Sequence, residues 1–381
     1  MIVLDEPYAS ELLVSWLEES QHPVLDNGFA RSLAPARLNL VPREEAVSRL
    51  EGGERVYTNS ENALAWIADN VRNDDLVRAI SLFKDKAAMR AALAQLDPGL
   101  LFKTCSADEL FELDFSRLEP PFVLKPSVGF CSMGVHVIRN RDDWERALAD
   151  IRKNSSVWRS RYPESVVGSG SFILEGYVEG TEYALDAYFD EEGRAHLLNV
   201  LRHDFASAAD TSDRMYVTSA PLVRETAPLF ATWLDRVNAL VGARSVPVHV
   251  EVRVKDGHVT PIEFNPLRFA GLGGTDVSFH AYGYRTYEAF LEGRDPDFDA
   301  AFSGKDGKVY TMSLLNPPAD ATGEEAFDYD AFAARFSNVL ELRRFDADRV
   351  GSYGFLFLET DADSADELDF LMRSDLKEFL R

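Results

Sequence analysis

Residues 246–276 read VPVHVEVRVKDGHVTPIEFNPLRFAGLGGTD. Between Val248 and Val254, valines alternate with polar residues, which is the pattern of a strand with one apolar and one polar face. Residues 255–257 predict a tight turn, because glycine tolerates positive φ and aspartate can hydrogen-bond its own backbone. We therefore expect a β-hairpin whose second strand carries Glu263 and Asn265 on one face.

The polar face of this predicted hairpin carries two carboxylates and an amide. Pairing of the strands brings Glu251 near Glu263 and Asn265, although the sequence leaves one residue of register open. These oxygens are hard ligands, and Mg²⁺ is usually held by one or two carboxylates together with substrate phosphates. The alternative is a solvated strand face on which Arg253 balances the charge. The hairpin alone does not decide between them.

The composition is that of an acidic globular protein long enough for two or three domains. The 381 residues include 64 Asp and Glu against 40 Lys and Arg, a formal net charge of −24. A field of this sign opposes nucleic acid and anionic membranes, so a bound phosphate would need a locally basic pocket. Cys105 and Cys131 are too few for a disulfide framework. With no visible signal peptide and no apolar run of about 18 residues, we expect a cytoplasmic protein that contacts no membrane.

Strand-like and helix-like segments alternate over roughly the first 70 residues. Apolar runs at residues 2–4, at 23–25 and from Val56 predict strands, and Ser10 can cap a helix between the first two. This alternation predicts a small parallel α/β domain. The domain has no Gly-x-Gly-x-x-Gly, so nothing indicates a dinucleotide site.

Two basic features follow. Residues 76–96 predict one helix with Lys84, Lys86 and Arg90, which taken alone reads as a solvated basic face. In the segment PFVLKPSVGFCSMGVHVI, residues 121–138, Lys125 ends a short strand beside a loop of small residues. Such a loop lets backbone N–H groups approach phosphate oxygens while the ammonium neutralises them. The alternative is a glycine-containing hairpin with a surface lysine.

Residues 171–193 predict two strands joined by a connector. Glu175 and Glu182 lie on either side of a turn at Gly180, and such a connector can offer backbone groups to a purine and a carboxylate to ribose. Two solvated acids in a hairpin are an equal alternative. A later strand ends in Arg202, and Arg214 lies in the loop that follows it. From about residue 300 the chain predicts a smaller α+β unit without a ligand motif.

Taken together, the motifs stand in a fixed order: basic helix, lysine–glycine loop, Glu-x₆-Glu connector and Glu…Glu-x-Asn hairpin followed by arginine. This order resembles the ATP-grasp superfamily, in particular its carboxylate–amine ligases, over about residues 84–295. The resemblance implies α/β and α+β architecture: a Rossmann-like N-terminal domain (1–83), an ATP-grasp domain (84–298) and a C-terminal α+β unit (299–381). The ATP-grasp domain would have two lobes with antiparallel sheets, about 84–170 and about 171–298.

The resemblance also implies roles for individual residues. Lys86, with Lys84 as the alternative, and Lys125 would contact ATP phosphates, and the 127–134 loop would cover them. Arg268 would stabilise the transferring phosphoryl group, although it lies three residues after Asn265, where two is commoner. Arg202 or Arg214 would be the additional basic residue of the second lobe. The remaining implied contacts are Ser127, Ser132, Met133 and Gly134 to phosphates, Glu175, Gly176 and Val178 to adenine, Glu182 to ribose, and Glu251, Glu263 and Asn265 to Mg²⁺ or Mn²⁺.

The implied reaction joins a carboxylate, such as an amino acid, to an amine. Phosphorylation of the carboxylate by ATP supplies a leaving group, which the amine displaces. His249 would contact the acceptor carboxylate or act as a base, and a purely structural histidine is an equal alternative. Other readings are a carboxyphosphate-forming carboxylase, another phosphotransferase, and a nucleotide-binding regulator without turnover. A homodimer is one oligomeric state that the resemblance suggests.

Overall fold

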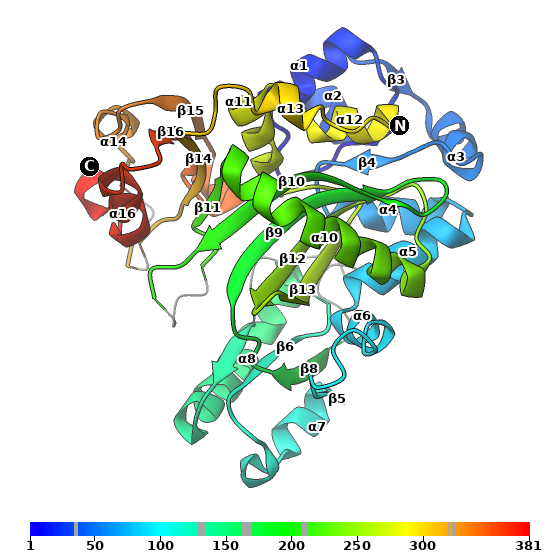
Figure 1. The fold of residues 1–381 in the computed structure, drawn as a ribbon. Coiled ribbons are helices and arrows are strands. Elements are labelled where there is room, and N and C mark those ends of the chain that lie inside the picture. The colour runs from blue at the N-terminus through cyan, green and yellow to red at the C-terminus, as the bar shows by residue number, and fades with distance from the viewer. Residues whose placement is uncertain (34–36, 129–133, 162–169, 208–211, 319, 322–324) are drawn as a thin grey trace.

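The computed structural model describes residues 1–33, 37–128, 134–161, 170–207, 212–318, 320–321 and 325–381. Its centre is one antiparallel sheet of eight strands (Figure 1). These strands are β9 (Thr181–Phe189), β10 (Ala195–Asp204), β11 (Met215–Thr218), β12 (Val246–Lys255), β13 (His258–Pro266), β14 (Lys308–Leu315), β15 (Val339–Arg344) and β16 (Gly354–Asp361). They lie side by side in the order β13-β12-β9-β10-β11-β14-β16-β15.

The hairpin of β12 and β13 confirms the prediction from residues 246–276. Glu251 pairs directly with Glu263, and His249 pairs with Asn265, which resolves the register left open by the sequence. The alternating valines face the core, where Val250 has no exposed surface. Helix α10 (Ala220–Val241) packs on this apolar face through residues such as Trp233. The carboxylates therefore occupy the opposite, open face of the sheet.

A second antiparallel sheet lies below the central one in Figure 1 and forms the first lobe. It has the order β5-β8-β6-β7. Its elements are β5 (Phe102–Ser106), α7 (Ala107–Glu112), η1 (Phe115–Arg117), β6 (Phe122–Pro126), β7 (His136–Ile138), α8 (Arg141–Arg161) and β8 (Ser171–Gly176). Strand β8 was expected in the second lobe, but it pairs with β5 and β6. Its Phe172 and Leu174 pack in the core of the first lobe, so the change of lobe follows Gly176.

The N-terminal region is the predicted parallel α/β domain. Its sheet has the order β3-β2-β1-β4, and the three pairings are parallel. The elements are β1 (Ile2–Val3), α1 (Glu11–Ser20), β2 (Val24–Leu25), α2 (Gly28–Leu33), β3 (Leu40–Val41), α3 (Arg43–Glu51), β4 (Tyr57–Thr58) and α4 (Ala63–Asn70). As predicted, Ser10 caps α1, accepting a hydrogen bond from the Leu13 N–H at 3.2 Å.

The single helix predicted over residues 76–96 is two helices, α5 (Asp74–Lys84) and α6 (Lys86–Ala92). Asp85 between them has extended backbone angles, and its carboxylate accepts from the first N–H groups of α6, as an N-cap aspartate does. The break directs Lys84 and Lys86 to different partners. Lys84 and Arg90 are buried, so the interpretation of these residues as a solvated basic face is wrong.

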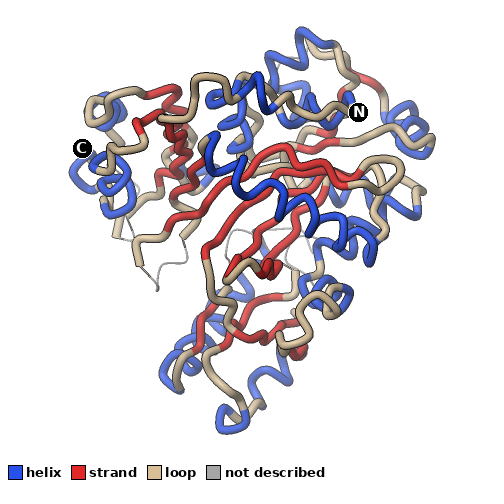
Figure 2. The backbone as a smooth tube through the Cα atoms, in the orientation of Figure 1, coloured by secondary structure: helices blue, strands red, loops and turns tan. Residues whose placement is uncertain are grey.

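The C-terminal unit does not form a separate sheet. Its first strand, β14, pairs with β11, and β16 and β15 extend the central sheet further, as the continuous row of strands in Figure 2 shows. Short helices complete the chain: η2 (Gly274–Asp276), α11 (Val277–Tyr282), α12 (Thr286–Glu292), α13 (Phe298–Ala301), α14 (Tyr329–Ala333), α15 (Ala347–Val350), α16 (Asp366–Arg373) and η3 (Lys377–Phe379). Within the described ranges, no helix is both long and apolar enough to cross a membrane.

Candidate active site

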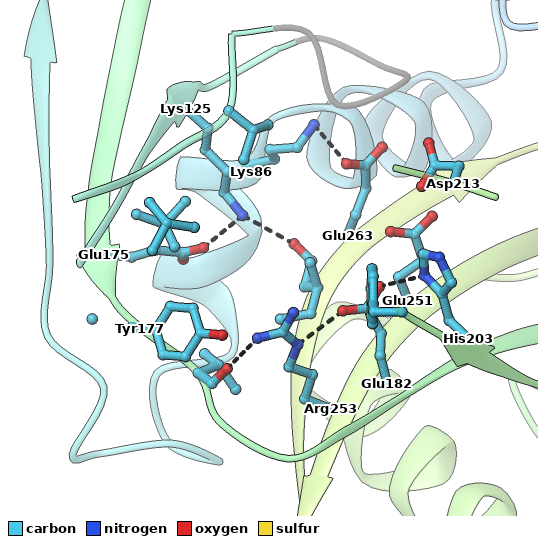
Figure 3. A pocket seen from close by; sticks show the side chains of 17 residues that line it. Lys86, Lys125, Glu175, Tyr177, Glu182, His203, Asp213, Glu251, Arg253 and Glu263 are labelled. Carbon is cyan, nitrogen blue, oxygen red and sulfur yellow. Dashed lines mark hydrogen bonds and ion pairs between the residues drawn. The ribbon is translucent and has the colours of Figure 1, made fainter. Parts of the chain in front are cut away.

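A cavity opens between the first lobe and the polar face of the central sheet (Figure 3). The first lobe contributes Lys125 and Glu175, and α6 contributes Lys86. The central sheet contributes Glu251 and Glu263. The fold thus brings motifs that are separate along the chain into one site, and its walls come from two different sheets.

Lys125 and Glu175 line this cavity, and the buried Arg90 contacts Glu175. The Lys125 Nζ lies 2.5 Å from Glu175 Oε1, and Arg90 Nε donates to Glu175 Oε2 at 2.9 Å. Burial alone would raise the pKa of Glu175, but Lys125 and Arg90 outweigh it and lower that pKa. The Glu175 carboxylate therefore positions two cations in this structure. Its predicted contact with adenine stays a prediction.

Lys86 faces the hairpin. Its ammonium lies 3.0 Å from Glu263 Oε2, and its side chain is 8% exposed. Its backbone N–H donates to the carbonyl of Ser127 at 2.8 Å, which ties the start of α6 to the start of the predicted phosphate loop. Of that loop, Gly134 is described, with a φ of 68°, whereas Ser132 and Met133 lie outside the described residues.

Glu182 is held by two basic side chains. His203 Nδ1 lies 3.0 Å from Glu182 Oε1, and Arg253 Nε donates to Oε2 at 2.8 Å. Arg253 also donates to the carbonyl of Val178 at 2.6 Å. Burial would raise the pKa of Glu182, but His203 and Arg253 lower it. Arg253 is therefore part of the site rather than a surface charge.

The three predicted metal ligands lie together on the hairpin. Glu251 and Glu263 face each other across the strands, and the buried Asn265 Oδ1 has no hydrogen-bond partner in the described part of the chain. Burial, then Glu263 and then Asp213 raise the pKa of Glu251 well above its ordinary value. A crowded set of hard oxygen atoms with one unsatisfied acceptor fits a divalent cation.

This set is incomplete without a substrate. Among the residues described, no three His, Cys, Asp or Glu side chains are arranged to hold a metal ion. Two carboxylates and an amide need further oxygen ligands, and phosphate groups in the adjoining cavity would supply them.

Arg268 is anchored by the N-terminal domain. Its Nε donates to Glu61 Oε1 at 3.1 Å, and Glu61 also pairs with Lys84. Burial would raise the pKa of Glu61, but Lys84 and then Arg268 outweigh it and lower that pKa to about 2. Glu61 thus stays ionised and fixes the guanidinium beside the hairpin.

The backbone at Leu267 explains how Arg268 reaches the site with one more residue than usual after Asn265. Leu267 is buried and has a φ of 62°, a left-handed conformation that is unfavourable for leucine. Its N–H donates to the carbonyl of Pro247 at 2.8 Å, and its own carbonyl accepts from the Thr58 N–H at 2.7 Å. These bonds hold a turn that absorbs the additional residue.

His249 is fixed by Asp186, which has no exposed surface. Its Nδ1 lies 2.7 Å from Asp186 Oδ1, and that carboxylate also accepts from the Ala270 N–H at 3.0 Å and the Thr275 hydroxyl at 2.6 Å. The other ring nitrogen, Nε2, lies 4.0 Å from Glu251 Oε1. Because Asp186 can only accept when ionised, Nδ1 carries the proton and Nε2 is the atom available to the site.

A second cavity lies next to the first and shares Asp213, Glu251 and Glu263 with it. Its other polar residues are His249, Asn265 and Arg268. Apolar residues complete its wall: Leu201, Tyr216, Ala270, Leu272, Met312, Leu314 and Phe355.

Two predicted basic residues are elsewhere. Arg202 pairs with Asp204 at 2.6 Å, because neighbouring residues of a strand point to opposite faces and His203 takes the site face. Arg214 donates to the carbonyl of Ser374, 2.6 Å away, at the end of α16. Neither arginine is among the described residues that line the two cavities, whereas His203 and Arg253 of the central sheet line the first one.

Sequence reasoning missed Glu61, His203 and Asp213. Tyr216 donates to Asp213 at 3.2 Å, and burial followed by Glu263 raises the pKa of Asp213. None of these residues belongs to a motif. The one signal available was the strand alternation that places His203 opposite Arg202.

Comparison with known proteins agrees with this architecture. Residues 118–276 match the family described as the ATP-grasp domain. No curated protein matches the chain. An L-amino acid ligase from Bacillus licheniformis is similar in structure, with a TM-score of 0.70, 18% identity, and coverage of 100% of this chain and 97% of that one.

Two further solved structures share the fold. An N5-carboxyaminoimidazole ribonucleotide synthetase from Thermotoga maritima has a TM-score of 0.61 and 15% identity, covering 100% of this chain and 98% of its own. A biotin carboxylase from Campylobacter jejuni has a TM-score of 0.60 and 12% identity, covering 94% and 87%. Residues 118–276 are thus similar to the ATP-grasp domain, and the chain as a whole shares the fold of these solved structures.

Proposed function

We propose that this chain is an ATP-dependent carboxylate–amine ligase that joins an amino acid or similar carboxylate to an amine and releases ADP and phosphate. The observation that carries the proposal is the pair of cavities that meet at Glu251 and Glu263. One cavity has the paired lysines and the connector expected around ATP, and the other can hold a carboxylate within reach of the γ-phosphate.

In the proposed reaction, the carboxylate oxygen attacks the γ-phosphorus and the bond to the β–γ bridging oxygen breaks, which gives ADP and an acyl phosphate. Lys86 and Lys125 neutralise the negative charge of the phosphate oxygens. To do so, they give up part of their ion pairs with Glu263 and Glu175. Mg²⁺ or Mn²⁺, held by Glu251, Glu263 and Asn265, would neutralise phosphate charge. Arg268, held by Glu61, stabilises the transferring group.

The amine then attacks the acyl carbon and phosphate leaves. An amine is nucleophilic only without its extra proton, so a base beside the acyl phosphate is useful. His249 Nε2 is suited to this step because Asp186 holds Nδ1 in the protonated form. This arrangement favours the base over a purely structural histidine.

The proposal also concerns partners and location. The net charge of −24 supports action on small molecules, without nucleic acid or a membrane, and ATP as a substrate is consistent with the cytoplasm. A homodimer remains a proposal from the resemblance to the superfamily.

The direct test incubates purified protein with Mg-ATP, pooled amino acids and small amines, and follows ADP and new masses. ADP together with a mass equal to two substrates less water supports the ligase. Turnover that requires bicarbonate would instead indicate a carboxylase, and bound but intact ATP under every condition would contradict an enzymatic role.

A further inference from the structure

The second cavity has a polar end and an apolar end. Its charged side chains are Glu251 and Glu263 on the hairpin, Arg268 after the hairpin, and Asp213 before β11. The opposite wall comes from the C-terminal unit. The described residues that β14 and β16 contribute are Met312, Leu314 and Phe355, and none of them is charged.

Strand pairing makes this apolar wall continuous. Met312 and Leu314 are two residues apart on β14 and therefore share a face. Leu314 pairs with Phe355 on β16, and Met312 pairs with Tyr216 on β11. Met312 and Phe355 are each 5% exposed. Met312, Leu314 and Phe355 thus form an apolar surface, next to which Tyr216 donates its hydroxyl to Asp213.

We propose that the substrate whose carboxylate is phosphorylated is an amino acid with an apolar side chain, and that Met312, Leu314 and Phe355 select it. The carboxylate lies beside Glu263 and Arg268, next to the γ-phosphate, and the side chain extends towards β14 and β16. Against Met312, Leu314 and Phe355, a charged side chain would lose its hydration and gain no partner from these three residues, whereas an apolar one gains from leaving water. This inference rests on the ligase reaction proposed above.

The test measures the first half-reaction alone. The full-length protein is incubated with Mg-ATP, single amino acids and hydroxylamine, which attacks the acyl phosphate and gives a hydroxamate. Methionine, leucine and phenylalanine should give hydroxamate at least about tenfold faster, as kcat/KM, than aspartate, glutamate or lysine, since a hydrophobic pocket discriminates on this scale.

Two variants test whether the apolar wall determines which amino acid is preferred. Leu314→Glu should lower kcat/KM for leucine by at least about tenfold and raise it for lysine, because it places an anion in the apolar end. Leu240→Glu makes the same change at a half-exposed end of α10 and should leave the preference unaltered. If Leu314→Glu does not fold, Met312→Ala is used instead. It should shift the preference in kcat/KM towards amino acids with larger side chains.

The outcomes separate the two proposals. Equal or faster hydroxamate formation with charged amino acids, or an unchanged preference in the folded wall variants, would overturn this inference and leave the ligase proposal intact. Absence of both ADP and hydroxamate with every amino acid would overturn both.

Discussion

The two cavities that meet at the hairpin differ in how their charges are arranged. In the first cavity, which we propose to be the nucleotide cavity, the cations already have anionic partners: Lys125 with Glu175, Lys86 with Glu263, and Arg253 with Glu182. In the second cavity, Arg268 and His249 are held from behind by Glu61 and Asp186. To bind phosphate, the lysines of the first cavity must give up ion pairs with glutamates. In the second cavity, Arg268 and His249 are already positioned by Glu61 and Asp186.

The largest expected effect is loss of one of the two hairpin carboxylates that both cavities share. Glu263→Gln should lower turnover by roughly 10³-fold, because it weakens the hold on phosphate charge at the point of transfer. ADP formation under saturating Mg-ATP measures this. Glu179→Gln is the matched control on the exposed connector, and its activity should equal that of the wild type. Normal turnover of Glu263→Gln would disprove the metal assignment.

The next largest effect is expected at Glu61, which holds Arg268 of the second cavity. Glu61→Gln leaves Lys84 and Arg268 without their buried anionic partner, and a pKa lowered from 4.5 to about 2 corresponds to roughly 3 kcal/mol of stability. Because the folded pKa is depressed, this contribution is complete above pH 4.5 and declines as the pH falls towards 2.

Urea unfolding at pH 7 and pH 4 measures this contribution. The difference in the free energy of unfolding between the wild type and Glu61→Gln should be smaller at pH 4 than at pH 7. A gap that is absent at pH 7 would contradict the anchoring role. The variant should also lose kcat more than it raises the KM for ATP, since Arg268 lies outside the nucleotide cavity.

The third effect separates the two chemical steps. His249→Asn should slow amide formation by about 10²-fold, the usual size of general base catalysis, and change ADP release in the hydroxylamine assay much less. Asp186→Asn should reproduce the defect and shift the pH profile of amide formation. His258→Asn, which alters an exposed histidine of β13 paired with Asp97, is the control. Equal loss in both assays would indicate a structural role for His249.

The smallest effects concern the basic residues of the second lobe. His203→Ala should raise the KM for ATP, whereas Arg202→Ala should change neither KM nor stability by a measurable amount. Arg214→Ala should lower stability by roughly 1 kcal/mol, since it removes hydrogen bonds at the end of α16, and leave the KM unchanged. A raised KM for ATP in Arg202→Ala alone would restore the prediction made from the sequence.

The two cavities also differ in how well sequence predicts them. The nucleotide cavity consists of local patterns: alternation places Glu251 and Glu263 on one face, and Lys125 precedes a loop of small residues. The predicted basic residues Arg202 and Arg214 do not line this cavity in the described structure, whereas His203 does, because strand alternation turns it to the face opposite Arg202.

Apart from its hairpin residues, the second cavity has no local pattern. Glu61 comes from the N-terminal domain, and Phe355 comes from a strand nearly 300 residues further along the chain. Phe355 lines this cavity because β14 pairs with β11 and β16 with β14, and Glu61 holds Arg268, which follows the left-handed turn at Leu267 that Thr58 contacts. Such contacts are tertiary, so they become visible only in the folded structure. The same reason explains why the resemblance indicated the reaction class and gave no side-chain preference.

The most direct test of the central claim follows oxygen from the carboxylate. An amino acid labelled with ¹⁸O in its carboxylate is turned over with unlabelled Mg-ATP and an amine, and the released phosphate is examined by mass spectrometry. If the carboxylate in the second cavity is phosphorylated, each phosphate carries one ¹⁸O atom from the amino acid. Release of ADP with unlabelled phosphate would contradict the account.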